Sequence, residues 1–389
     1  MFKKKYLQNF ILSIINIFFY CIFKLLNINV LNNHLIGTVG HSAIEINYFF
    51  LLKRSKKIKK KNYILFLDNS QICRDLKIMF DGKIRIIVNT TLNTIIKKFL
   101  QKNSEFGLDI GVSHFLNVEE NKIKGFGIGM RDWKEGFNRD QDYWHLKNDY
   151  KDYFAYQNLN IDEEKKDELL EKLNINVNKK IALIHIKTKI GNACAKVTDP
   201  YTYIKTIEFL IENHFQIIFV GREIMPNIFR KYSIINYANS KFTSWMNDVI
   251  LTEKSDFFLC FGSGLAQLPS VMNKSCLYVG FWHVFSPISN QRSIFIPSIL
   301  KNKNNGEFLK FAEQTEYAHK IRMQHFSSEL YEVINPDKDD LLNGTKELLD
   351  LYNNKKIDNG QINFKKKLNL QKCESNISKF FLEKYTYLC

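Results

Sequence analysis

The stretch CFGSGLAQLPSVMNK, residues 260–274, has residue types that can hold a phosphate group. Gly262, Ser263 and Gly264 follow an apolar run and precede a predicted short helix over residues 265–273. Glycines let a diphosphate approach the backbone, a helix N-terminus offers free N–H groups, and a serine hydroxyl can donate a further hydrogen bond. The alternative is an ordinary turn in which Ser263 caps the helix.

A second stretch with phosphate-binding residue types is HIKTKIGNACAKVTDP, residues 185–200, which begins where a predicted strand ends. It carries Lys187 and Lys196. Lysine is a point-charge partner for phosphate. The alternative is a solvated basic loop in a lysine-rich chain.

A third stretch, VGREIMP over residues 220–226, also follows a predicted strand. Gly221 allows a close approach to the backbone, and the Arg222 guanidinium can reach a phosphate or a carboxylate. The alternative is an ion pair between Arg222 and Glu223.

The stretch IGTVGHS, residues 36–42, suggests proton transfer instead. Gly37 and Gly40 form a turn that admits a ligand, and His41 opens the helix that follows. A neutral imidazole at that place can act as a general base. The alternative is a histidine that packs over the turn.

Strands and helices alternate along most of the chain, which predicts parallel sheets covered by helices on both faces. In such sheets a ligand binds beyond the carboxyl ends of the strands. A strand with a glycine turn is predicted over residues 34–40, and strands over residues 62–68, 83–89, 180–187, 215–221, 256–262 and 275–281. Helices are predicted over residues 42–54, 91–102, 161–173, 199–214, 244–254, 265–273, 337–354 and 377–385.

The alternation breaks over residues 103–160, which predicts a boundary between two Rossmann-like domains. We therefore divide the chain into an N-terminal apolar helix, a first α/β domain with the interdomain connection, a second α/β domain, and a linker with a C-terminal helix. These segments cover residues 1–30, 31–160, 161–355 and 356–389.

The composition restricts the function further. Hydrophobic residues make up 45% of the 389 and charged residues 25%, which is typical of globular domains. A net charge of +16 suits anionic partners such as nucleotides, nucleic acid or an acidic membrane surface. No GxGxxG, GxxxxGK[ST], HExxH or GxSxG motif occurs. Seven cysteines without a CxxC pair favour a reducing compartment and no metal site.

The N-terminal apolar run over residues 10–26 follows three lysines. Its polar residues recur at spacings of three and four and predict a narrow polar stripe: Asn9, Ser13, Asn16, Tyr20, Lys24 and Asn27. A helix in the membrane interface fits this pattern, and a helix docked on protein or a spanning helix interrupted by Lys24 are the alternatives.

An ordered set of stretches in the second half resembles a family of bacterial glycosyltransferases of surface-polysaccharide biosynthesis with the two-Rossmann GT-B architecture. The set comprises HIK at 185–187, YTYIKTIEFLIENHFQIIFVGRE at 201–223, SIINYANS at 233–240 and MNDVILTEKSDFFLCFGSGLAQLPSVMNK at 246–274. VGHSAIEINYFF at 39–50 and ISKFFLEKY at 377–385 are weaker matches.

The resemblance implies a GT-B-like α/β fold whose two domains face a cleft, with the acceptor on the first and a nucleotide-sugar on the second. It implies that Ser263 and Gly264 take the diphosphate, that Lys187 and Lys196 neutralise the leaving nucleotide, and that Asn236 and Tyr237 contact the nucleoside. His41, with Glu45 or Asp109 as alternatives, would deprotonate the acceptor hydroxyl.

The implied reaction uses the nucleotide-sugar as substrate and needs neither a cofactor nor a metal. The implied acceptor is a lipid-linked glycan at the cytoplasmic face of the cytoplasmic membrane, with residues 1–30 on the membrane. The chain departs from the family pattern where lysine stands at the usual arginine position, as at Lys187. It also departs at the strand end that usually reads Arg-x-Gly, because here it reads Phe219-Val220-Gly221 with Arg222 displaced to the position after the glycine. A non-catalytic carbohydrate-binding protein is therefore the alternative function. A nucleic-acid binder is disfavoured because aromatic residues do not interleave with the basic run at 51–62.

Overall fold

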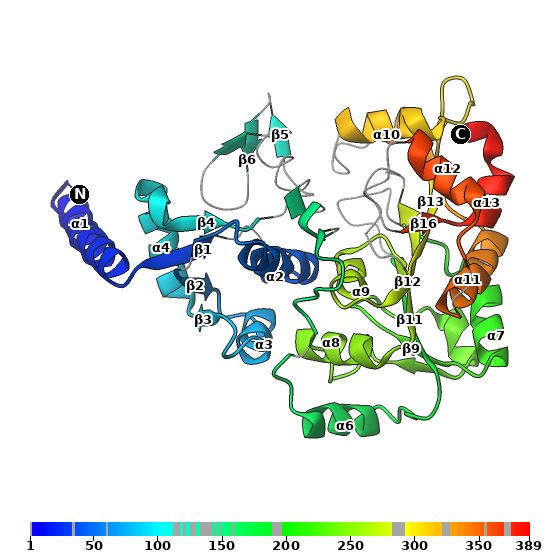
Figure 1. Cartoon of the computed structure of the whole chain (residues 1–389), viewed down its shortest axis with the longest axis horizontal. Helices are drawn as coiled ribbons and strands as arrows, with labels where there is room; N and C mark the ends of the chain where they lie inside the picture. The colour runs from blue at the N-terminus through cyan, green and yellow to red at the C-terminus, as the bar shows by residue number, and fades with distance from the viewer. Residues whose placement is uncertain are drawn as a thin grey trace. The chain divides into compact units, whose positions relative to one another are not determined.

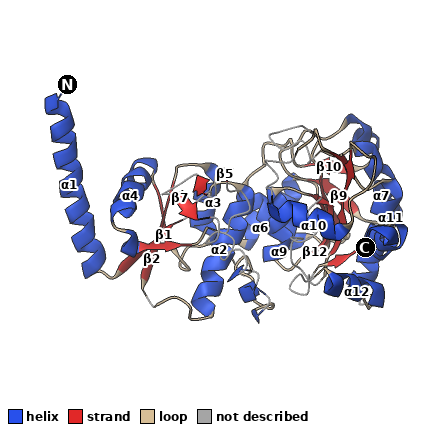
Figure 2. Cartoon of the chain, turned by 90° about the horizontal axis from the view of Figure 1, so that it is seen from above, coloured by secondary structure: helices blue, strands red, loops and turns tan. Residues whose placement is uncertain are grey.

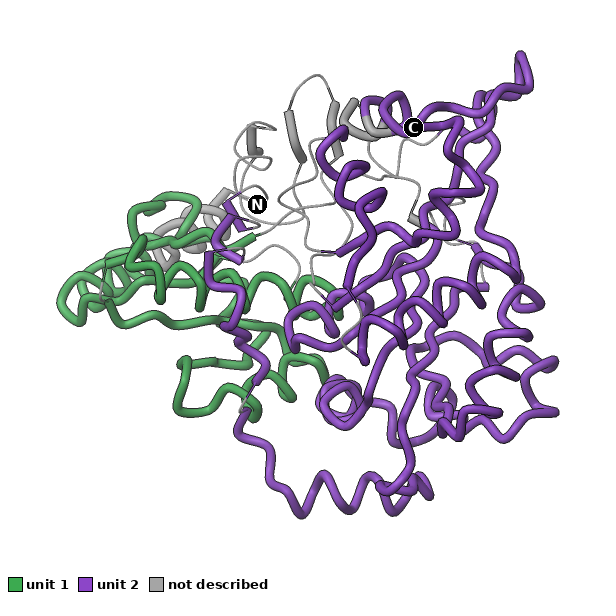
Figure 3. Tube along the Cα trace, turned by 45° about the vertical axis from the view of Figure 1, so that its right-hand side comes forward, with its two compact units in different colours: residues 1–140 green, residues 141–389 purple. Residues whose placement is uncertain are grey.

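The computed structural model divides the chain into two compact units, Met1–Asp140 and Gln141–Cys389 (Figure 3). It describes residues 2–32, 36–59, 61–111, 117–119, 122–124, 130–132, 142–143, 145–147, 149–157, 159–188, 197–281, 292–320, 327–353, 356–368 and 375–389. The division falls at Asp140 and not near residue 160, because Tyr156 packs edge-on against Trp245 and the Lys147 ammonium contacts Ser270. The segment after Asp140 thus contributes side chains to the core of unit 2.

Unit 1 is built on a four-stranded parallel sheet in the order β3-β2-β1-β4. Its strands are β1 (Ile28–Asn32), β2 (Asn62–Leu67), β3 (Arg85–Val88) and β4 (Gly107–Asp109). Its helices are α1 (Phe2–Leu25), α2 (Val39–Arg54), α3 (Gln71–Met79) and α4 (Thr90–Lys102), with the 3-10 turn η1 (Ser104–Phe106). Three short antiparallel strands complete it, β5 (Asn117–Glu119), β6 (Lys122–Lys124) and β7 (Met130–Asp132).

The first strand lies earlier than the sequence pattern indicated. The sequence predicts a strand and a glycine turn within residues 34–40, whereas β1 covers Ile28–Asn32 and lies between β2 and β4. The reason is that the residues from Ile28 to Leu31 are all buried in the sheet. Residues 36–38 form a bridged turn that leads into α2.

Helix α1 docks on unit 1 through its C-terminal half, where it runs into β1 (Figure 2). Phe23 is buried among Phe99 and Phe106, and Phe19 packs against the same cluster. Asn103 donates a side-chain hydrogen bond to the Asn16 amide oxygen at 2.9 Å. Among the helices that the structure describes, none has the length and apolarity needed to cross a membrane.

The predicted polar stripe of α1 does not face solvent as a whole. Asn16 lies on the side that contacts α4, and Tyr20 packs edge-on against Phe106. The docked side is therefore part polar and part aromatic, because Asn103 supplies an amide partner for Asn16 within an otherwise apolar contact.

Unit 2 contains a seven-stranded sheet in the order β10-β9-β8-β11-β12-β13-β16, with every pairing parallel. Its strands are β8 (Ile181–His185), β9 (Gln216–Phe219), β10 (Ile234–Asn236), β11 (Phe257–Phe261), β12 (Ser275–Phe281), β13 (Ile294–Pro297) and β16 (Asn376–Ile377). An antiparallel pair lies outside this sheet, β14 (Ile299–Asn302) with β15 (Tyr331–Ile334).

Helices cover both faces of this sheet, with α7 and α11 on one side and α8 and α9 on the other (Figure 1). The helices are α6 (Glu163–Lys172), α7 (Ile204–Glu212), α8 (Trp245–Lys254), α9 (Gln267–Val271), α10 (Phe311–Lys320), α11 (Lys338–Tyr352), α12 (Asn359–Lys367) and α13 (Lys379–Lys384). The 3-10 turns are η3 (Pro200–Tyr203), η4 (Asn227–Lys231), η5 (Gly264–Ala266) and η7 (Thr386–Leu388). The predicted helix start at Asp199 is confirmed, since its carboxylate accepts from the Tyr201 N–H at 3.0 Å.

The strand order of unit 2 is that of a doubly wound sheet. The chain starts at β8, continues outward through β9 and β10, and then returns to β11 on the other side of β8. The order therefore reverses between β8 and β11. In open parallel sheets the crevice for a ligand lies beyond the carboxyl ends of the strands at such a reversal.

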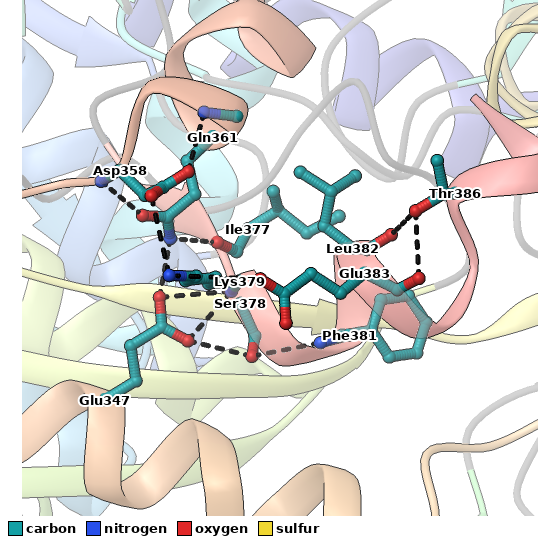
Figure 4. A network of polar contacts seen from close by, with 11 residues as sticks. Glu347, Asp358, Gln361, Ile377, Ser378, Lys379, Phe381, Leu382, Glu383 and Thr386 are labelled. Atoms are coloured by element: carbon teal, nitrogen blue, oxygen red, sulfur yellow. Dashed lines mark hydrogen bonds and ion pairs between the residues drawn. The ribbon is translucent and has the colours of Figure 1, made fainter.

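The C-terminal segment is part of unit 2 and is held there by a carboxylate on α11. Glu347 accepts hydrogen bonds from the Ser378 hydroxyl at 2.9 Å, the Lys379 N–H at 2.9 Å and the Gln361 amide at 2.6 Å (Figure 4). Burial raises the pKa of Glu347 to about 7, against the lowering effect of these donors. One side chain thus ties α11 to α12 and to the turn between β16 and α13.

Candidate functional site

The loops that follow β8 and β11 leave the sheet side by side. Cys260 on β11 is the register partner of His185 on β8, so both strands end at the same edge. The residues just beyond are Lys187, which is half-buried, and the turn of Gly262, Ser263 and Gly264. The structure therefore brings two of the three predicted phosphate-binding stretches to the reversal point of the sheet.

The third stretch lies at the end of β9, next to β8, and contacts His185 directly. Gly221 has a φ of +106°, and a Cβ built on it would lie 2.5 Å from His185 Nδ1. The imidazole therefore occupies the space that a side chain at residue 221 would need. Two features therefore favour glycine at position 221: the positive φ of its backbone and the lack of room for a Cβ beside the imidazole.

His185 is buried, and burial lowers its pKa to about 4. The positive charges of Lys187 and Arg222 act in the same direction, while the bond to the Val220 carbonyl opposes them. Nδ1 lies 3.2 Å from that carbonyl oxygen, so in the neutral ring Nδ1 carries the proton and donates it. Nε2 of the neutral ring is consequently the acceptor nitrogen.

Arg222 is oriented by two acceptors. Its guanidinium donates to the Gly221 carbonyl at 2.9 Å and to the buried carboxylate of Asp248 at 3.2 Å. About half of the arginine side chain remains exposed. Arg222 thus pairs with Asp248 on α8 and not with Glu223, and it keeps an exposed cationic surface near the end of β9.

The Ser263 hydroxyl oxygen is buried and makes no hydrogen bond with any residue that the structure describes. Burial raises the pKa of the neighbouring Cys260 thiol. A buried hydroxyl without a partner costs free energy, on the order of 1–3 kcal/mol. Ser263 is thus a polar group at the reversal point whose hydrogen-bonding capacity the described residues do not use.

The helix expected after this turn is shorter than predicted. We predicted a helix over residues 265–273, whereas the chain forms the 3-10 turn Gly264–Ala266 followed by α9 over Gln267–Val271. Ser263 does not cap it through its side chain. Pro269 within the run removes one backbone donor and the positive φ of Asn273 ends it, so a regular helix cannot extend over all nine positions.

The remaining predicted residues of unit 2 take different positions. Asn236 ends β10 and is exposed. Tyr237 is fully buried, and its hydroxyl donates to the Ser244 carbonyl and accepts from the Ser244 N–H, each at 3.1 Å. This burial favours a structural role for Tyr237. Lys196 lies outside the described residues.

In unit 1, His41 and Glu45 form a buried pair on the first turns of α2. His41 Nδ1 lies 2.9 Å from Glu45 Oε1, one helical turn away. Glu45 is fully buried, and its second oxygen has no hydrogen-bond partner among the described residues. A carboxylate in that place holds the imidazole with Nδ1 as donor, which is the arrangement that orients a histidine base.

The other predicted residues of unit 1 surround the start of α2 or end a strand. Gly37, with a φ of +119°, donates its N–H to the Ser42 hydroxyl at 3.2 Å. Gly40 is buried in the first turn of α2. Asp109 ends β4, and its carboxylate accepts from the Gly111 N–H at 2.9 Å.

Comparison with known proteins gives similarities to glycosyltransferase structures. No protein-family model and no curated protein matches the chain. A family 9 glycosyl transferase from Veillonella parvula DSM 2008 is 6% identical, with 83% of this chain and 96% of that chain covered and a TM-score of 0.46. ADP-heptose heptosyltransferase II of E. coli is 12% identical, with 69% and 90% covered and a TM-score of 0.44.

The iron-containing dodecameric glycosyltransferase TibC from enterotoxigenic E. coli H10407 is 14% identical, with 88% of this chain and 77% of that chain covered and a TM-score of 0.44. These TM-scores all lie below 0.5, so the fold of each unit is taken from its own strand order and pairing. Within the described ranges, no group of three His, Cys, Asp or Glu side chains could hold a metal ion.

Two residues of the unit 2 site were not among the predicted ones. His185 is not among the predicted site residues, although the motif HIK at a strand end contains it. Asp248 lies on α8 and approaches Arg222 only through the fold, so no sequence spacing indicates it. The signal for His185 was its position as the last residue of a strand whose following loop carries a cation.

Proposed function

We propose that the protein is a glycosyltransferase that moves a sugar from a nucleotide-sugar donor to a glycan acceptor. The observation that carries the proposal is the reversal of strand order between β8 and β11, with cationic and glycine-rich loops at that edge. A doubly wound sheet binds nucleotides at this place. Lys187 and Arg222 supply positive charge there, and Ser263 supplies an unused hydroxyl.

In the proposed reaction the acceptor oxygen forms a bond to the anomeric carbon while the bond from that carbon to the donor phosphate breaks. The leaving nucleoside diphosphate gains negative charge, which Lys187 and Arg222 would stabilise. The acceptor hydroxyl loses its proton to a base. His41 is the proposed base, and Glu45 is the proposed positioning residue that holds its imidazole.

We further propose that the acceptor is a lipid-linked glycan and that the protein works at the cytoplasmic face of the cytoplasmic membrane. The net charge of +16 supports an anionic environment of this kind. The reaction as proposed needs no metal, because the cations of unit 2 take the leaving-group charge.

The first test is a thermal-shift screen of the full chain against UDP, GDP, CMP, ADP and dTDP. A nucleotide that binds only the folded state raises the melting temperature by mass action. We expect a shift with one nucleotide and its loss in the Ser263→Ala variant. Because the buried Ser263 hydroxyl makes no hydrogen bond with the described residues, its removal should not lower the stability of the protein and can raise it by about 1–3 kcal/mol.

Ser244→Ala is the matched control. The Ser244 hydroxyl caps α8 by accepting from the Asn247 N–H at 3.1 Å, so its loss should cost about 1 kcal/mol of stability. The nucleotide shift should persist in this variant. If no nucleotide shifts the parent protein, the proposed donor site is wrong. Binding without turnover would instead favour a non-catalytic carbohydrate-binding protein.

A further inference from the structure

The outward side of α1 is apolar along its described length. Ile14, Ile17, Phe18, Cys21 and Leu25 recur at spacings of three and four and are all exposed. Ile17, Phe18 and Leu25 expose 63%, 58% and 84% of their surfaces. The opposite side of the helix contacts unit 1, as described above for Phe23. The helix therefore has two apolar sides, and only one of them is covered by this unit.

A basic segment lies beside the end of this helix. The Asn62 side chain donates to the Leu26 carbonyl at 2.7 Å, and the Asn62 N–H donates to the Asn27 carbonyl at 3.1 Å. Lys61 donates to the Asn29 amide oxygen at 2.9 Å. The C-terminal end of this basic segment, at Lys61 and Asn62, is thereby held against the chain that directly follows α1. The exposed cations of the segment are Lys53, Arg54, Lys56, Lys57 and Lys59.

The charge of the protein is concentrated in this part of the sequence. Residues 1–61 contain eleven Lys and Arg residues and one acid, Glu45, which gives +10 of the total +16. Glu45 is fully buried and faces His41, so it presents no charge to the surface. An apolar helix side next to an acid-free basic segment is complementary to a bilayer with anionic headgroups.

We propose that the outward side of α1 and the exposed cations of residues 53–59 form one docking surface for an anionic lipid bilayer. The apolar side chains enter the headgroup boundary, and the lysines contact the lipid phosphates. This differs from the interfacial helix predicted from the sequence, because Asn16 and Tyr20 of the polar stripe face the protein and the opposite side faces the lipid. The proposal does not depend on the proposed glycosyl transfer.

The test is co-sedimentation of the full chain with vesicles of phosphatidylcholine, with and without phosphatidylglycerol. We expect binding to the anionic vesicles that weakens as salt is added. The I17S/F18S variant should bind them on the order of tenfold more weakly, since two apolar side chains no longer insert. The K53Q/K56Q/K59Q variant should lose on the order of a hundredfold, because each lysine near an anionic surface contributes separately.

Two control variants separate the surface from general effects. K165Q/K310Q/K338Q removes the same charge from exposed positions of unit 2 and should keep most of the binding. V177S/I224S removes exposed apolar side chains of unit 2 and should leave binding unchanged. All substituted side chains are exposed, so the melting temperatures of the four variants should match that of the parent.

Three outcomes would overturn the proposal. The first is equal binding to neutral and anionic vesicles that I17S/F18S does not weaken. The second is an equal loss of binding in the two triple-lysine variants, which would assign the effect to net charge alone. The third is a concentration-dependent dimer in sedimentation velocity that I17S/F18S abolishes, which would make the occupant a second copy of this chain.

Discussion

The imidazole of His185 lies against the backbone of Gly221, and a Cβ on that glycine would come within 2.5 Å of the ring nitrogen Nδ1. The contact joins the ends of β8 and β9 at the edge of the sheet where the proposed donor site lies. Because His185 also donates to the Val220 carbonyl, the ring is held in one orientation with Nε2 as acceptor.

Gly221→Ala should therefore destabilise unit 2. The φ of +106° is unfavourable for alanine, and the added methyl group meets the buried ring, so we expect a loss of about 2–4 kcal/mol. The measurement is urea unfolding. Gly306→Ala is the matched control, because Gly306 has a φ of +74° but nothing within 4 Å of a Cβ. It should lose only about 1 kcal/mol. Equal losses in the two variants would mean that the contact with His185 has no energetic consequence.

Most of the alternating strands and helices of unit 2 could be predicted from the sequence. The predicted strands at 180–187, 215–221 and 256–262 overlap β8, β9 and β11, because apolar runs bounded by turn residues are typical of buried parallel strands. The two-residue strand β16 and the strands β13 to β15 were not predicted, since their pairing depends on partners distant in sequence. The sequence analysis assigns the residues of α12 to a linker, although a capping box of Asp358 and Gln361 starts this helix.

For the candidate sites as well, some residues could be predicted from local sequence patterns, whereas the contacts between distant residues could not. Residues that sit at strand ends or helix starts, such as Ser263 and His41, could be found from local patterns. The contacts that orient them could not: Asp248 reaches Arg222 from another helix, and Gly221 receives His185 from another strand. The burial of Tyr237 could not be predicted from the sequence either. Strand β10 is short and a turn follows it, so the residues there show no hydrophobic periodicity.

Stability should fall in acid partly because of His185. Its folded pKa of about 4 lies below the unfolded value of 6.5, so the unfolded chain binds the proton first as the pH falls. The contribution of this group is present above pH 6.5 and is lost towards pH 4, with a size on the order of 3 kcal/mol. His185→Asn should remove this dependence. Urea unfolding of both proteins between these pH values measures it, and parallel curves would contradict the prediction.

Glu347 should produce the opposite dependence. Burial raises its folded pKa from 4.5 to about 7, so the folded protein binds the proton first. Its contribution to stability is present below pH 4.5 and is lost as the pH rises to 7, on the order of 3 kcal/mol. Glu347→Gln should flatten this part of the profile. We would compare unfolding free energies at the two pH values in a His185→Asn background, where the opposing titration is absent. A slope unchanged by Glu347→Gln would exclude this carboxylate as its source.

Two phenylalanines on α1 should respond differently to truncation. Phe23 is 3% exposed and packs on Phe99 and Phe106, whereas Phe18 is 58% exposed. Phe23→Ala should cost about 3 kcal/mol of the stability of unit 1, because it leaves a cavity in an aromatic cluster. Phe18→Ala should change stability by less than about 0.5 kcal/mol. Circular dichroism during urea unfolding gives both values. Little loss in Phe23→Ala would mean that α1 is not docked as described.

The pair His41 and Glu45 gives the sharpest test of the proposed chemistry. With the nucleotide-sugar identified by the thermal-shift screen, His41→Asn should lower kcat about 10²–10⁴-fold and leave donor binding intact, because a lost base affects proton transfer and not the donor site. Glu45→Gln keeps the shape but removes the charge that holds the imidazole. It should lower kcat less than His41→Asn does and shift the pH profile of kcat. Asp109→Asn tests the alternative base. If only this variant loses turnover, while His41→Asn retains it, the base is Asp109, and the buried pair on α2 serves the structure of unit 1.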